Sequence, residues 1–118
     1  ELAADIEAAP HKAVAYNSDG KLALPEAGKP ALGFILSDAP GGDTDKTTAG
    51  TEVDVLIKEI GLGLASAAIA IGAAVTVTAE GALKTAASGD FILGFAMTAA
   101  TAAGDLVQVQ ITKSGYAA

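Results

Sequence analysis

Several groups of residues in this 118-residue chain have types and spacings that could support chemistry. The run Gly61-Leu62-Gly63-Leu64-Ala65-Ser66, followed by Glu80, imitates the glycine-rich turn and the ribose-binding acid of dinucleotide sites. Such sites need a third glycine, where this chain has Ser66, and further alternating strands and helices, which do not follow. We therefore interpret the run as a glycine-rich connection.

Metal binding and nucleophilic catalysis have weaker support in the sequence. His11 is the single histidine, with Asp5 and Glu7 nearby, and neither this group nor the acids of residues 38–45 has the spacing of a known ligand set. The absence of Cys excludes disulfides, thiolate zinc sites and thiol nucleophiles, and no serine lies in a nucleophile-elbow motif. We expect no catalytic residue, no cofactor, no metal site and no small-molecule substrate, so the protein is not expected to be an enzyme.

One lysine leaves an alternative function open. The run Asp43-Thr44-Asp45-Lys46 resembles the tip at which lipoyl and biotinyl carrier domains are modified on a lysine, and those domains also contain two pseudo-symmetric β halves. In that family the lysine occupies a tight hairpin, whereas Lys46 lies in a loose, glycine-rich stretch. A solvated loop is the simpler interpretation, and a carrier domain modified at Lys46 remains the alternative.

Charge and hydropathy exclude further classes of partner. The chain has seven Lys, no Arg and 14 acidic residues, giving a net charge of −7, so nucleic acid is not an expected partner. Residues 60–78 are almost long enough to span a membrane, but they lack anchoring residues close to both ends, and we expect no membrane partner. Residues 1–5 do not resemble a signal peptide, so export is not expected.

Alanine dominates the apolar composition. The chain has 28 Ala and 32 larger apolar residues, in a mass of 11.5 kDa. Because each buried methylene contributes only about 0.8 kcal/mol, alanines add little to a core, and a domain of this size is marginal. We expect one domain that gains part of its stability from a partner or from its own copies.

An internal repeat organises the chain. Residues 13–39 align with residues 74–100 at a spacing of 61, and the alignment needs no gap. The first copy then has seven surplus residues, after which the spacing becomes 54. The matches at 61 include Ala13/Ala74, Gly20/Gly81, Leu22/Leu83, Gly28/Gly89, Gly33/Gly94 and Phe34/Phe95, and those at 54 include Gly50/Gly104, Val53/Val107 and Val55/Val109. The repeat predicts an N-terminal arm at residues 1–12 and one β domain at 13–118, with half-domains at 13–59 and 74–113 joined by a connection at 60–73.

Both half-domains have the sequence pattern of short strands. Residues 75–78 form a β-branched run that ends at a turn signal, and the last strand of each half, at 52–58 and 106–112, alternates apolar with polar residues. Glycines limit any helix at 65–71 to about two turns. We predict a mostly all-β fold, a small β-sandwich or barrel of two pseudo-repeated half-domains with at most one or two short helices.

These motifs resemble the capsid decoration, or cement, proteins of tailed bacteriophages. The resemblance covers about residues 10–113 and rests on Gly72-Ala73-Ala74-Val75-Thr76-Val77, Ile92-Leu93-Gly94-Phe95-Ala96 and Gly104-Asp105-Leu106-Val107-Gln108-Val109. It implies a tulip-like β fold and a structural protein that assembles in the host cytoplasm. It further implies binding to the major capsid protein on the outer surface of the virion, as a homotrimer at three-fold or quasi-three-fold sites.

Two sets of interaction residues follow as hypotheses. The arm lies outside the repeated pattern and carries isolated apolar residues among acids and alanines, as expected of a segment that orders on binding, or of one that packs on its own domain. The predicted capsid-binding residues are Leu2, Asp5, Ile6 and Pro10. The predicted self-association residues, in the apolar connection, are Leu62, Leu64, Ile69 and Ile71.

Overall fold

The computed structural model describes residues 1–7, 9–36 and 46–118, and within them the chain forms strands and no helix. The all-β prediction is therefore confirmed. In chain order the strands are β1 (Ile6–Glu7), β2 (Ala13–Tyr16), β3 (Leu22–Ala23), β4 (Gly33–Ile35), β5 (Lys46–Thr47), β6 (Val55–Leu56), β7 (Glu59–Leu64), β8 (Ala74–Val77), β9 (Leu83–Thr85), β10 (Gly94–Ala96) and β11 (Leu106–Ile111).

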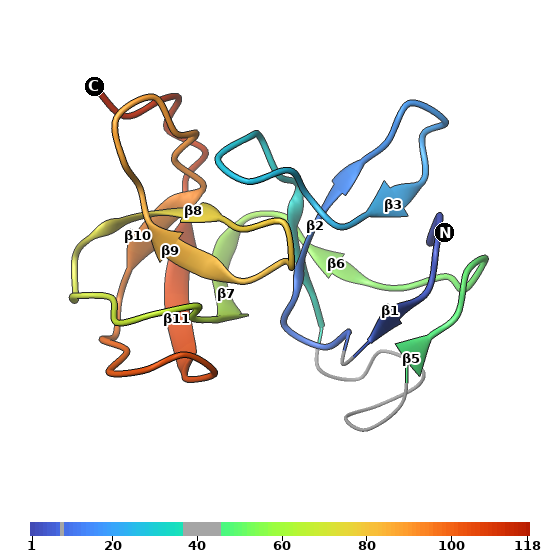
Figure 1. The fold of residues 1–118 in the computed structure, drawn as a ribbon, viewed down its shortest axis with the longest axis horizontal. Helices are drawn as coiled ribbons and strands as arrows, with labels where there is room; N and C mark the ends of the chain where they lie inside the picture. Colours follow the sequence, from blue (N-terminus) through green and yellow to red (C-terminus); the bar gives the residue numbers. More distant parts are fainter. Residues whose placement is uncertain (8, 37–45) are drawn as a thin grey trace.

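The strands form two lobes that lie side by side (Figure 1). The first lobe contains a four-stranded sheet in the order β3-β2-β4-β6 and a ribbon of β1 with β5. The second contains a five-stranded sheet in the order β7-β11-β10-β8-β9. Every pairing within these sheets is antiparallel. The two antiparallel sheets form a small compact domain, consistent with the predicted β-sandwich.

The register of the strands follows the same spacings as the sequence repeat. Ala13 pairs with Phe34 in the first lobe, and Ala74 pairs with Phe95 in the second, both at a spacing of 61. On the neighbouring strand at its other side, Phe34 pairs with Leu56, and Phe95 pairs in the same way with Gln110. Leu56 and Gln110 are 54 residues apart, as in the second part of the repeat. The two copies therefore form the same strand arrangement despite little sequence identity outside the glycines and core positions.

The repeat also includes the N-terminal residues. The amide of Leu2 donates to the carbonyl of Thr51 at 3.0 Å, and the amide of Ala65 donates to the carbonyl of Asp105 at 2.9 Å. These bonds are equivalent if the N-terminal segment is aligned at a spacing of 63. The first seven residues thus occupy, in the first lobe, the place that residues 64–70 occupy in the second. Residues 65–71 make isolated bridges instead of a helical turn.

A hydrophobic core crosses the junction between the lobes. Phe34 of the first lobe is 1% exposed and belongs to a cluster made mainly of second-lobe residues. A Cβ on Gly61 would lie 2.9 Å from Phe34, and one on Gly63 would lie 2.7 Å from it. The glycines in β7 therefore make room for the phenylalanine ring, because a larger residue at either position would overlap it.

Backbone hydrogen bonds also join the lobes. The amide of Ala13 in β2 donates to the carbonyl of Gly81 at 2.7 Å, and the amide of Gly28 donates to the carbonyl of Val77 at 3.0 Å. Gly81 lies in the turn between β8 and β9, so this turn of the second lobe packs on the first. The lobes form a single packed unit.

Candidate interaction surface

The outer side of the second-lobe sheet carries a group of exposed apolar side chains. β11 alternates strictly between buried and exposed residues, and β7 follows the same pattern over residues 60–63. Alternate residues of both strands therefore face the core, including the two glycines of β7, while the residues between them face solvent. We call the following set the uncovered face: Ile60, Leu62, Ile71, Phe95, Met97 and Leu106.

Strand register makes the uncovered face continuous. Gln110 of β11 pairs with Ile60 on one side and with Phe95 on the other, so the three side chains form a row across the sheet. In the next row Gln108 pairs with Leu62, and its carbonyl accepts a 2.7 Å hydrogen bond from the amide of Met97. The outward residues of these two rows are apolar or glutamine. Contiguous exposed apolar surface of this kind marks sites of protein interaction.

The structure separates the predicted self-association residues into two groups. Leu62 is exposed, Leu64 is half-buried, and Ile71 is 68% exposed at the turn beside β10. Ile69, in contrast, is buried in the main core cluster. Two of the four residues thus belong to the uncovered face, and their role in self-association stays a prediction.

The predicted capsid-binding residues of the arm lie mostly inside the first lobe. Leu2 and Ile6 are 1% and 3% exposed and pack in a core cluster with Val14. Pro10 is also buried. Asp5 is exposed, and its carboxylate accepts a 2.8 Å hydrogen bond from the amide of Ala49. Asp5 is therefore the member of this set whose side chain faces solvent.

The described residues offer little to catalysis or metal binding. Among residues 1–7, 9–36 and 46–118 no three His, Asp or Glu side chains cluster closely enough to hold a metal ion. His11 lines a groove of about 170 Å³ whose other walls are apolar, including Phe34, Leu56 and Leu62. The described part of the chain also contains no helix that could cross a membrane.

The alternative sites from the sequence fall near or within the undescribed segment. Asp38, Asp43 and Asp45, considered as a calcium loop, lie outside the described residues. The backbone of Lys46 lies in β5 and pairs with Glu7 of β1. A lysine within a paired strand differs from the exposed hairpin tip of carrier domains, so this pairing does not favour the carrier alternative.

Among the carboxylates that the structure describes, Asp105 is the one whose pKa its surroundings clearly change. It accepts hydrogen bonds from the backbone amide and the hydroxyl of Thr101, both at 3.0 Å, and from the amide of Ala102 at 3.2 Å. These donors favour the charged form and lower the pKa of Asp105 below its ordinary value of 3.8. Because this exposed carboxylate holds the loop before β11, its role is structural.

Sequence reasoning missed most of the uncovered face. The sequence pattern places Leu106 in an alternating strand and gives Phe95 only as the repeat equivalent of Phe34, so neither is predicted as part of an interaction surface. The alternation at residues 106–112 was sufficient to place Leu106 on the wet side with Gln108. The exposure of Phe95 could not be predicted, because its repeat equivalent Phe34 is buried.

The fold and this surface define a small two-lobed β protein that presents an apolar interaction face. Comparison with known families identifies the family. The family model described as the XM1 gp53 minor capsid protein matches residues 3–111, and the chain belongs to this family. It is therefore a phage capsid-associated structural protein, as the resemblance to capsid decoration proteins implied.

A solved structure shares the fold. The N base of head fiber gp8.5 from bacteriophage phi29 matches with a TM-score of 0.70 and 16% identity, over 98% of this chain and 92% of that one. At this identity the likeness concerns the fold alone. No curated protein matches the chain.

Proposed function

We propose that the protein binds the outer surface of a phage capsid as a cement protein and stabilises the shell, with the major capsid protein as its partner. The observation that carries this proposal is the family match over residues 3–111 to a minor capsid protein. Association as a homotrimer at three-fold or quasi-three-fold sites is part of the proposal. A net charge of −7 fits an outer location, since an acidic surface repels nucleic acid and keeps a decorated particle soluble.

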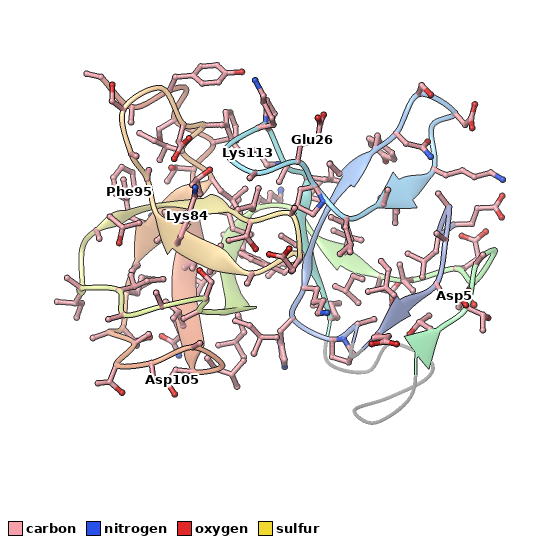
Figure 2. All side chains as sticks on the ribbon, in the orientation of Figure 1. Asp5, Glu26, Lys84, Phe95, Asp105 and Lys113 are labelled. Atoms are coloured by element: carbon pink, nitrogen blue, oxygen red, sulfur yellow. The ribbon has the colours of Figure 1, made fainter. Side chains whose placement is uncertain are left out.

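The capsid contact is proposed to include the N-terminal side of the first lobe. Asp5 is exposed there, whereas Leu2 and Ile6 support it from the core. Figure 2 shows Asp5 and Phe95 on opposite lobes, facing away from each other. One end of the molecule is thus available to the shell while the uncovered face remains available to another partner.

Binding to capsids that lack the protein tests this function. Purified protein is added to such capsids, and the pelleted fraction and the temperature of capsid disruption are measured. We expect saturable co-sedimentation and a higher disruption temperature. Asp5→Lys should weaken binding, whereas Glu26→Lys, an equal charge change on another exposed loop, should not. Absence of co-sedimentation at micromolar protein would contradict the function, and equal binding by Asp5→Lys would contradict the assigned contact.

A further inference from the structure

The equivalent strands β6 and β11 differ in how many neighbours they have. β11 lies between β10 and β7, whereas β6 pairs with β4 alone at the edge of the first-lobe sheet. Since β4 and β10 are repeat equivalents, the neighbour that β6 lacks is the one that β7 provides in the second lobe. At the spacing of 63, residues 1–118 contain no equivalent of residues 59–63. Within the described chain no strand lies beside residues 53–57, which we call the open edge.

Apolar side chains of the open edge are less buried than their equivalents in the second lobe. Ile57 is 45% exposed, whereas Ile111 is 7% exposed. β7 covers Ile111 directly, since a Cβ on Gly61 would lie 3.3 Å from its side chain. The two valines before Ile57 are half-buried, and both of their equivalents are fully buried: Val53 and Val55 in the first lobe, Val107 and Val109 in the second. A strand added beside the open edge would therefore remove apolar area from water.

Backbone groups of the open edge also lack a partner. In an antiparallel sheet the amide and the carbonyl of one residue face the same neighbouring strand. The carbonyl of Asp54 accepts a 3.1 Å hydrogen bond from the amide of Leu36, so the backbone of Asp54 faces the β4 side. The alternate residues Val53, Val55 and Ile57 face the opposite side, where the described residues provide no backbone partner. Unpaired edges of this kind accept extended segments as additional strands.

Acidic side chains indicate what the added strand carries. Glu52 and Asp54 are both exposed and, being two residues apart, lie on the same side of their strand. The carboxylate of Glu52 is 3.7 Å from the amino group of Glu1, whereas Asp54 has no ion pair with a described residue. Opposite charges on directly paired residues of neighbouring strands stabilise a sheet. A basic residue opposite Asp54 is therefore favoured, and a second copy, with a net charge of −7, is the less suitable donor.

We infer that the open edge binds an extended segment of the shell protein, antiparallel to residues 53–57, with small or apolar residues facing the three apolar side chains and Lys or Arg opposite Asp54. The identity of this donor rests on the proposed function. The open edge adjoins the N-terminal segment, because Glu1 and Glu52 are close, so it extends the capsid contact proposed at Asp5.

A strand joined to the chain tests the open edge without capsids. In the second lobe β7 runs directly into Ala65, the equivalent of Leu2, so residues placed before Glu1 would continue along the open edge. The fused protein carries there a copy of residues 59–63 in which lysine replaces Leu62, the residue that pairs with the equivalent of Asp54. Its control has proline in place of both glycines of the copy, which removes the amides that would donate to the edge.

Thermal unfolding compares the two fusions. We expect the fused protein to melt at least about 4 °C above the proline control, because the added strand buries the exposed side chains and pairs the free backbone groups. Equal melting temperatures would overturn the strand position.

A peptide tests the charge requirement. The acetylated and amidated peptide Glu-Ile-Gly-Lys-Gly is titrated into the protein, and the amide signals of residues 53–57 are followed by NMR, beside a peptide with glutamate in place of lysine. The lysine peptide should bind at least about threefold more tightly. Asp54→Lys should reverse this order, whereas Glu26→Lys, an equal charge change elsewhere, should preserve it. An unchanged preference in Asp54→Lys would overturn the pairing opposite Asp54.

Capsids identify the donor. The fused protein, whose edge is filled, should bind capsids that lack the protein at least about tenfold more weakly than the proline control. Equal capsid binding by the two fusions would show that the shell is not the donor. A wild type that dimerises in sedimentation velocity, while the fused protein stays monomeric, would assign the edge to a second copy and also overturn the inference. If the wild type did not bind capsids, the proposed function and the donor would both be wrong, whereas the fusion and the peptide would still decide whether the edge accepts a strand.

Discussion

Replacing Gly33 with alanine should destabilise the protein strongly, because β4 and β6 approach each other closely at this residue. A Cβ on Gly33 would overlap the carbonyl oxygen of Leu56 and lie 2.8 Å from its carbonyl carbon and 3.0 Å from the Cα of Ile57. To restore a contact distance of about 3.5 Å the neighbouring strand must move by roughly 0.7 Å or more. The obstacle is backbone, which cannot rotate away as a side chain can.

The cost can be estimated from this overlap. Overpacking in cores costs about 1–3 kcal/mol and occasionally more, and a backbone obstacle in a buried sheet belongs at the upper end, at about 3 kcal/mol. Gly20→Ala is the control: Gly20 has a φ of 77° with open space around it, so only the left-handed conformation is penalised, at about 1–2 kcal/mol. For a domain of this size about 1 kcal/mol lowers the melting temperature by roughly 4 °C.

Denaturation monitored by circular dichroism compares the two variants. We expect Gly33→Ala to melt at least about 4 °C below Gly20→Ala. The second copy gives an independent test, since a Cβ on Gly94 would overlap the carbonyl oxygen of Gln110 in the same way. If Gly33→Ala and Gly94→Ala were no less stable than Gly20→Ala, the strand packing described above would be refuted.

Two further predictions concern a turn and a pH dependence. His11 has a φ of 70° and is the repeat equivalent of Gly72, which has a φ of 83°. His11→Gly should therefore leave the stability unchanged or raise it by up to about 1 kcal/mol, whereas Gly72→Ala should lower it by about 1–2 kcal/mol. Chemical denaturation that reversed this order would contradict the equivalence. The pKa of Asp105 is lowered in the folded protein, so the stability that its charged form contributes is complete above pH 3.8 and is lost as the pH falls through the folded pKa. Asp105→Asn should therefore lose less stability than the wild type between pH 5 and about pH 2. Parallel curves of unfolding free energy against pH for the two proteins would contradict the assigned hydrogen bonds.

The repeat and its strands were predictable because they depend on residues that leave a strong pattern. Glycines at turns, such as Gly20 and Gly81, and the Leu-Gly-Phe runs recur at fixed spacing, and the register follows from them. The all-β class and the link to capsid proteins came from the same pattern.

Two parts of the fold were not predictable from that pattern. β7 contains Gly61 and Gly63, which suggest a flexible connection, and their packing role depends on Phe34, a residue distant in sequence. The N-terminal segment aligns with the second copy at 63 instead of 61, and only Ala4/Ala67 and Ile6/Ile69 match there. Tertiary packing, not local sequence, decides both cases.

A cryo-EM map of the native phage particle tests the central claim most directly. We predict density for the two-lobed protein on the outside of the shell, in contact with the major capsid protein and grouped in threes at three-fold or quasi-three-fold positions. A particle whose outer shell surface carries no such density would contradict the assignment as a cement protein.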